Sequence, residues 1–263
     1  MVEARLAPWS DDSAVEIAAA IQNALNTASY QHRMARCLFE IACLEGLERL
    51  PGTGGLPLAF LVYFQKLLDL FGESTRLSLK RLRKVGFRVQ CRSECSHCCY
   101  QMPTGLSTAE LIYLYHGMHQ SGTFSRFFRR CLEAEEVWVE VFRRQTNSNP
   151  LLSDVRQPTE LASKAYRSLD HPCPFLQGQV CQVYPYRPFA CRMHFSLSSP
   201  HWCRPSHFQN AYALGFNLEP SKIVSDALEK LENRFNLQLS DVMVCGLLEL
   251  AVNVVKFQRI RWL

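Results

Sequence analysis

The sequence lacks a long apolar run and has little of the alternation that marks β-strands. Its most apolar stretch, LPLAFLVYF at 56–64, is too short to cross a bilayer and is followed by polar and charged residues. Apolar and polar residues alternate only briefly, in FRVQC (87–91) and QVCQVY (179–184). Neither an internal repeat nor a low-complexity tract is present. These absences argue against a membrane partner, a repeat protein and a large sheet.

The first twenty residues also lack the pattern of an export signal, which is a basic stretch followed by an apolar one. Glu3, Asp11, Asp12 and Glu16 interrupt MVEARLAPWSDDSAVEIAAA. We therefore expect a cytoplasmic location, where thiols stay reduced. The 12 cysteines of the chain are then expected to serve metal or redox chemistry and not to form disulfides.

Helical patterning dominates the rest of the chain. Apolar residues make up 48% and charged residues 20%, which is the profile of a folded protein with an ordinary core. Apolar positions at helical spacing predict helices over residues 15–26, 34–50, 56–72, 124–144, 220–235 and 240–260. PGTGG at 51–55 and Gly72 are expected to end two of them. Ser107 and Glu110 form a capping-box pattern before another helix.

The fold class expected from this pattern is mainly α: a helical single domain wrapped around a cysteine-rich, irregular metal-binding core. We divide the chain into an N-terminal helical region with a basic segment (1–88), a cysteine-cluster metal-binding core (89–205) and C-terminal helices (206–263). The basic segment, 76–92, carries seven Lys and Arg residues and no acidic one, whereas the whole chain has a net charge of only +5. The positive charge is therefore local, on one face of an expected helix.

Eight of the cysteines gather in two knots. The first knot, CRSECSHCC, holds Cys91, Cys95, Cys98 and Cys99, and the second holds Cys173, Cys181 and Cys191, followed by Cys203. Thiolates separated by two or three residues can converge on metal, and folding would bring the two knots together around it. Eight thiolates fit two four-thiolate sites, or one site with spares. The other cysteines are expected to be small buried hydrophobes: Cys37, Cys43, Cys131 and Cys245.

Two metals remain open for these thiolates. Cysteine-only ligation with eight residues to choose from suits an iron–sulfur cluster, most simply a [4Fe–4S] cluster. Nearby cations would favour such an anionic cluster, and Arg92, Arg187, Arg192 and Arg204 flank the knots, although surface ion pairs explain those arginines equally well. The alternative is zinc in a closed structural site. A neighbouring histidine such as His97 or His194 could also replace one thiolate.

The run CPFLQGQVCQVYPYRPFACR (173–192) resembles the signature of the YkgJ-like, CxxCxxCC cysteine-cluster family. The matching residues are Cys173, Pro174, Phe175, Leu176, Cys181, Tyr184, Arg187, Pro188, Cys191 and Arg192. In the first knot Cys95, Cys98 and Cys99 keep the family spacing, whereas Cys91 stands one residue too far away. Ser96 and His97 stand where the family has its usual glycine. The resemblance extends over about residues 87–204.

The resemblance implies a metal-binding module that holds iron–sulfur or zinc. One branch of the family is similar to flagellin lysine methylases, in which an iron–sulfur cluster is implicated in methyl transfer. We therefore expect a redox or group-transfer role, with protein-lysine methylation as one form of it and a protein substrate or redox partner. On the same basis Tyr184, Arg187 and Arg192 are expected to lie beside the cofactor and to fix the second loop.

Three alternatives remain beside this interpretation. Cys91, Cys95 and Cys98 have the spacing of radical S-adenosylmethionine enzymes, but the alternating strands and helices of that fold are missing. A nucleophilic Cys–His site would leave seven cysteines without a role. A structural zinc module could present its basic helical face to a protein or nucleic-acid partner. Nucleic acid is the less favoured partner, because Phe87 is the only aromatic residue of the basic segment.

Overall fold

The computed structural model describes residues 27–92, 95–122, 124–148 and 156–263. The helix expected over 15–26 lies outside these residues. Among those described, the fold is mainly helical, as predicted. The α-helices are α2 (Ala28–Ala42), α3 (Leu50–Thr53), α4 (Leu58–Lys84), α5 (Thr108–Gln120), α6 (Phe124–Ser148), α7 (Arg156–Ser168), α8 (Phe189–Arg192), α9 (Lys222–Glu232) and α10 (Met243–Glu249). No helix in this part of the chain combines the length and apolarity needed to cross a membrane.

Short elements connect these helices. Single turns of 3-10 helix lie at η1 (Leu47–Arg49), η2 (His97–Tyr100), η3 (Tyr184–Tyr186), η4 (Pro200–Cys203) and η5 (Asn210–Tyr212). The strands form three separate pairs. They are parallel β1 (Gly55–Leu56) and β6 (Arg261–Trp262), antiparallel β2 (Leu176–Gln177) and β3 (Val180–Cys181), and antiparallel β4 (His194–Ser196) and β5 (Gly215–Asn217).

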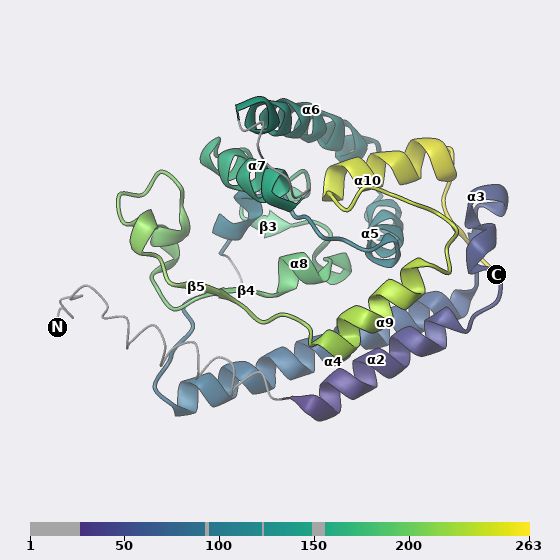
Figure 1. The fold of residues 1–263 in the computed structure, drawn as a ribbon, viewed down its shortest axis with the longest axis horizontal. Helices are drawn as coiled ribbons and strands as arrows, with labels where there is room; N and C mark the ends of the chain where they lie inside the picture. Colours follow the sequence, from purple (N-terminus) through teal and green to yellow (C-terminus); the bar gives the residue numbers. More distant parts are fainter. Residues whose placement is uncertain (1–26, 93–94, 123, 149–155) are drawn as a thin grey trace.

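The helices form two layers with α5 between them (Figure 1). The long helix α4 packs along α2, and α9 lies against α2 on the same side. On the other side α6 packs on α7 and α10. The short elements α8, β3, β4 and β5 lie between the layers, with α8 next to α5 (Figure 1).

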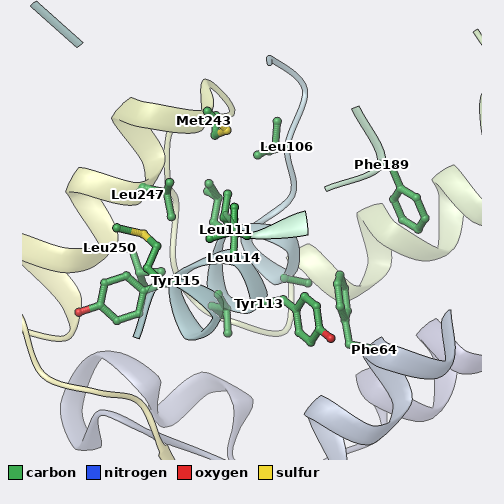
Figure 2. Close-up of a cluster of buried hydrophobic side chains, with 14 of the residues drawn as sticks. Phe64, Leu106, Leu111, Tyr113, Leu114, Tyr115, Phe189, Met243, Leu247 and Leu250 are labelled. Atoms are coloured by element: carbon green, nitrogen blue, oxygen red, sulfur yellow. The ribbon is translucent and has the colours of Figure 1, made fainter. Parts of the chain in front are cut away.

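Helix α5 is the centre of the core. Ten of its 13 residues are buried, which is why its sequence shows apolar residues on every side and no single stripe. Leu111 and Leu114 pack with Met243 and Leu247 of α10, and Tyr113 packs on Phe64 of α4 with ring centroids 5.0 Å apart (Figure 2). This helix therefore joins the two layers.

Helix α4 corrects one expectation. It does not end at Gly72 but continues to Lys84, because its inward face stays buried past the glycine, through Ser74, Ser78 and Leu82. The helix stops before Gly86, whose φ of +93° is in the left-handed region that favours glycine. The basic residues of the segment therefore extend the same helix, and Arg76, Lys80, Arg83 and Lys84 are exposed.

The C-terminal region also differs from the expectation drawn from the sequence. The helix expected over 240–260 is split into α10 and a π-helical turn, η6 (Leu250–Val254). Lys256 and Phe257 then have positive φ angles and turn the chain back. The chain ends in β6, which pairs with β1, so the break is explained by the need to close a parallel strand pair.

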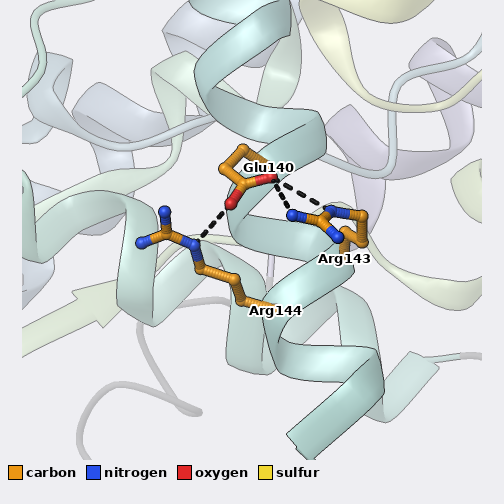
Figure 3. Close-up of polar contacts among 3 residues, drawn as sticks. All are labelled: Glu140, Arg143 and Arg144. Carbon is orange, nitrogen blue, oxygen red and sulfur yellow. Dashed lines mark hydrogen bonds and ion pairs between the residues drawn. The ribbon is translucent and has the colours of Figure 1, made fainter.

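The outer face of α6 carries a small network of charges. Glu140 accepts hydrogen bonds from Arg143 at 2.8 Å and from Arg144 at 2.6 Å (Figure 3). All three side chains are largely exposed. Water screens such pairs, so this network contributes little to the stability of the fold.

Candidate metal centre

Three contacts bring the two cysteine knots together. Before the first knot, the Gln90 amide donates to the Ser196 carbonyl at 2.9 Å, and the Ser196 amide donates to the Cys91 sulfur at 3.2 Å. At its end, the Cys173 amide donates to the Cys99 carbonyl at 2.7 Å. The turn η2 also packs against η4, which carries Cys203. Folding therefore gathers eight cysteines that are spread over 113 residues of sequence.

Five of these cysteines line one small cavity of about 30 Å³, named here the small cavity. They are Cys98, Cys99, Cys173, Cys181 and Cys191. Arg187 and His194 also line it, and the rest of the wall is largely apolar. Among the described residues its lining includes no carboxylate.

A second cavity of about 340 Å³, named here the large cavity, lies beside the first. Its cysteines are Cys91, Cys95, Cys98 and Cys203. Cys98 is therefore the cysteine that lines both cavities. His97, His194 and Arg167 stand in the same wall. All eight predicted cysteines thus line one or both of two neighbouring cavities.

A groove of about 780 Å³ opens next to both cavities, between α4 and the segment from Tyr184 to Phe195. Its walls include Cys91, Cys95, Cys98 and Cys191. Four arginines, Arg76, Arg92, Arg187 and Arg192, and two acids, Asp69 and Glu73, line it as well. The groove is therefore net positive and gives a larger molecule access to the cysteines.

Burial or a hydrogen bond shifts the pKa of most thiols in the two cavities. Burial raises the pKa of Cys91 to about 11 and of Cys173 to about 12, and it raises the pKa of Cys191 well above its usual value. Cys98 is the exception, because a hydrogen bond with the Cys99 side chain lowers its pKa to about 7. The same bond raises the pKa of Cys99. Without a cation, Cys98 is therefore the thiol that ionises most readily in the small cavity.

The donor set fits a thiophilic metal. Sulfur is the dominant donor in both cavities, and soft thiolates select zinc, copper(I) or iron–sulfur clusters over magnesium or calcium. A bound metal would replace the protons that burial keeps on these sulfurs. Within the described ranges, however, no three His, Cys, Asp or Glu side chains converge on a position that could hold an ion. The cysteines are therefore described as lining the cavities, and ligation stays a prediction.

The arginines expected beside the cofactor hold the second loop. The Arg187 guanidinium lies 3.6 Å from the centre of the Tyr184 ring and donates to the Tyr184 carbonyl at 3.3 Å and the Cys191 carbonyl at 3.5 Å. Arg192 donates at 2.6 Å to the carbonyls of Arg187 and Pro185. These bonds fix the backbone between Tyr184 and Cys191.

Three further residues position the cysteines, and the sequence pattern predicts this role for none of them. Arg130 of α6 donates to the carbonyls of Leu176, at 2.9 Å, and Cys173, at 3.3 Å. Arg167 of α7 donates to the Cys203 carbonyl at 2.8 Å. No signal in the sequence could have found them, because each partner is more than 35 residues away.

Glu110 is the third of these residues. The predicted capping box forms, with one carboxylate oxygen accepting from the Ser107 amide at 2.9 Å. Its other oxygen accepts from the Phe189 amide at 2.7 Å, at the start of α8. Helix α8 carries Cys191, so the buried cap of α5 also holds a cysteine-bearing turn. Burial raises the pKa of the Glu110 carboxyl.

The four cysteines outside the knots differ from one another. Cys37 and Cys131 are buried, as expected for small hydrophobes. Cys43, at the end of α2, is exposed, and Cys245 is half-buried. The expectation of burial is therefore wrong for Cys43, because the helix end places it toward solvent.

Comparison of the chain with protein-family models, with curated proteins and with solved structures finds no match. The resemblance to the YkgJ-like cysteine-cluster family therefore stays a prediction from the residues quoted above. What can be argued about function depends on the geometry of the cysteine-lined cavities.

Proposed function

We propose that this chain holds an iron–sulfur cluster, most simply [4Fe–4S], at the small cavity and uses it in redox or group-transfer chemistry. The observation that carries the proposal is the set of five cysteines, drawn from both knots, around one cavity with no carboxylate in its described lining. Four thiolates complete such a cluster, so the set has one cysteine in excess. The adjacent pair Cys98 and Cys99 contains that excess, because Cys98 also lines the large cavity.

The surroundings support an anionic centre. Arg187 lines the small cavity, and Arg192 lies in the groove beside it. Positive charge close by favours thiolates and an anionic cluster. When bound, an iron–sulfur cluster supplies electron transfer or an exchangeable metal position. The chain's own contribution is to hold the Tyr184–Cys191 backbone rigid through the carbonyl contacts of the two arginines.

The groove suggests which partner is favoured. Its four arginines outnumber its two acids, so an acidic protein surface is attracted and a lysine side chain is repelled. This charge favours a redox partner over the lysine methylation that the family resemblance implies. A reducing, cytoplasmic compartment is part of the proposal, because the thiols have to stay free of disulfides.

The test is anaerobic purification followed by an absorbance spectrum and analysis of iron, sulfide and zinc. Wild-type protein is expected to be brown, with matched iron and sulfide. Cys181→Ser removes a sulfur from the small cavity and should lower both contents. Cys43→Ser is the matched control, because this exposed cysteine lies outside both cavities. Wild-type iron and sulfide contents in Cys181→Ser would remove the assignment of this cavity.

A structural zinc module is the second candidate. It is favoured by the exposed basic face of α4, where Arg76, Lys80, Arg83 and Lys84 stand free of the core. A colourless protein with stoichiometric zinc would support it. The partner test is then Arg83→Glu with Lys84→Glu. Unchanged retention on heparin and on nucleic acid would eliminate a polyanionic partner for this face.

A further inference from the structure

We propose that the large cavity holds a second, separate metal centre, ligated by Cys91, Cys95 and Cys203. None of these three cysteines lines the small cavity, so the four-thiolate requirement of the proposed cluster is met without them. The second centre therefore stands independently of the proposed function. It also gives a role to Cys91 and Cys203, neither of which matches the spacing of the family signature.

The three thiols are not core residues. A buried structural cysteine in this chain is exemplified by Cys131, whose relative exposure is 0%. Cys91 is exposed, and Cys95 and Cys203 are half-buried at the edge of a cavity of about 340 Å³. Packing in the hydrophobic core does not explain three incompletely buried cysteines in one place. Unligated thiols at such a site would also be open to oxidation.

Backbone contacts hold each of the three in place. The Ser196 amide of β4 donates to the Cys91 sulfur at 3.2 Å, and the His97 amide donates to the sulfur of Cys95. Amide hydrogen bonds to sulfur are a regular feature of metal-bound thiolates. Cys203 is fixed by Arg167, which donates to its carbonyl at 2.8 Å. Two parts of the chain, the first knot and the turn that carries Cys203, therefore line one cavity with sulfur.

The chemistry of the wall defines the class of metal. In the described part of its lining the large cavity has no carboxylate, while His97 and His194 supply nitrogen. Three sulfurs with nitrogen close by select a thiophilic metal, either iron in an iron–sulfur cluster or zinc. Either His97 or Cys98, which line the same cavity, can supply the fourth donor. Iron and zinc both bind thiolates of this kind, and elemental analysis distinguishes them.

The experiment counts centres on the intact chain. Native mass spectrometry of anaerobically purified wild-type protein, paired with iron, zinc and sulfide analysis, is expected to find two centres per chain. Cys203→Ser and Cys91→Ser should each lose one centre and keep the other. Cys173→Ser should lose the opposite centre, and Cys43→Ser should keep both. Circular dichroism checks that each variant is folded.

The outcomes separate this inference from the proposed function. A wild-type chain with one centre that Cys203→Ser retains would overturn the second centre and leave the first intact. A Cys173→Ser variant with unchanged metal, beside a Cys203→Ser variant that loses it, would support the second centre and overturn the first. The wild-type count needs no substitution, so the inference stays falsifiable even where a variant fails to fold.

Discussion

The helical frame and the cysteine core of this protein are built on different physical principles. The helical frame, α2, α4, α5, α6, α9 and α10, buries a continuous set of large apolar side chains. The cysteine core, residues 91–92, 95–99 and 173–203, has single turns and two- or three-residue strands that hydrogen bonds to main-chain atoms hold together. Apolar burial can fold the frame by itself. The cysteine core contributes fewer buried apolar side chains, namely Phe175, Leu176, Val183 and Phe189, so a metal would complete its folding.

The largest effect is expected from removing a hydrogen bond that joins the helical frame to the cysteine core. Glu110→Gln leaves one acceptor oxygen for the amides of Ser107 and Phe189, so one of them faces an NH₂ group. The expected loss is about 2–3 kcal/mol of unfolding free energy, because the site is fully buried. Metal content should fall as well, since α8 carries Cys191.

Urea unfolding and metal analysis check this prediction. Glu249→Ala is the control, because it removes the carboxylate that accepts from the Ser240 amide at 2.6 Å, inside the frame. It should lower stability while metal content stays at the wild-type level. Equal metal loss in both variants would show that metal binding by the core depends on the stability of the whole fold and not specifically on the Glu110 contact.

A steric change tests how closely the two regions fit. A Cβ at Gly117 of α5 would lie 2.3 Å from Cγ of Tyr186, which belongs to the loop of the second knot. Because that atom is near the Tyr186 backbone, Gly117→Ala has to move the loop, and we expect a loss of about 1–3 kcal/mol. Thermal unfolding measures the change.

Gly72→Ala is its control on the same chain. This glycine is inside α4, and nothing lies within 4 Å of the added Cβ. Alanine should stabilise the helix by about 0.5–1 kcal/mol. If both substitutions change stability in the same direction, the packing between α5 and the Tyr186 loop is looser than described.

A pH experiment sharpens the description of the frame alone. Burial raises the pKa of Glu232, whose carboxylate accepts from the Thr108 amide at 2.9 Å. The folded chain then binds this proton more tightly than the unfolded chain does, so the contribution of Glu232 to stability falls as pH rises above about 4.5. Urea midpoints of wild type and Glu232→Gln at acidic and neutral pH measure it. A wild-type advantage that grows with pH would contradict the sign.

The smallest effect is expected on the surface. Arg143 and Arg144 lower the pKa of the Glu140 carboxyl, so its contribution has the opposite sign from that of Glu232 and is lost as the pH falls. Because Glu140 is exposed, Glu140→Gln should leave the neutral-pH unfolding midpoint within the scatter of repeated measurements. A clear drop would mean that α6 depends on this network.

The sequence predicts the frame far better than the core. The capping box of Ser107 and Glu110 is local, and the structure has it. Helix α4 runs past Gly72 because its inward face stays buried through Ser74, Ser78 and Leu82. The amide of Phe189, the second partner of Glu110, is 79 residues away, and no pattern announces such a contact.

The site follows the same division. Cysteine spacing predicts the gathering of the eight thiols, which does occur around two cavities. Cysteine spacing does not predict which thiols line which cavity, because that depends on long-range hydrogen bonds such as the one from the Ser196 amide to the Cys91 sulfur. Arg130 and Arg167 act through main-chain carbonyls, which any sequence supplies. Their roles therefore emerge only from the folded chain.

Hydrogen exchange of the anaerobic metal-bound chain, compared with the same chain after chelation, tests the central claim most directly. Metal removal is predicted to abolish protection in peptides covering 91–99 and 173–203, while α2, α4 and α5 keep theirs. Unchanged protection in the cysteine core would contradict the account, since the core would then fold without metal. Loss of protection throughout the frame would also contradict the account, since the frame would then need metal to fold.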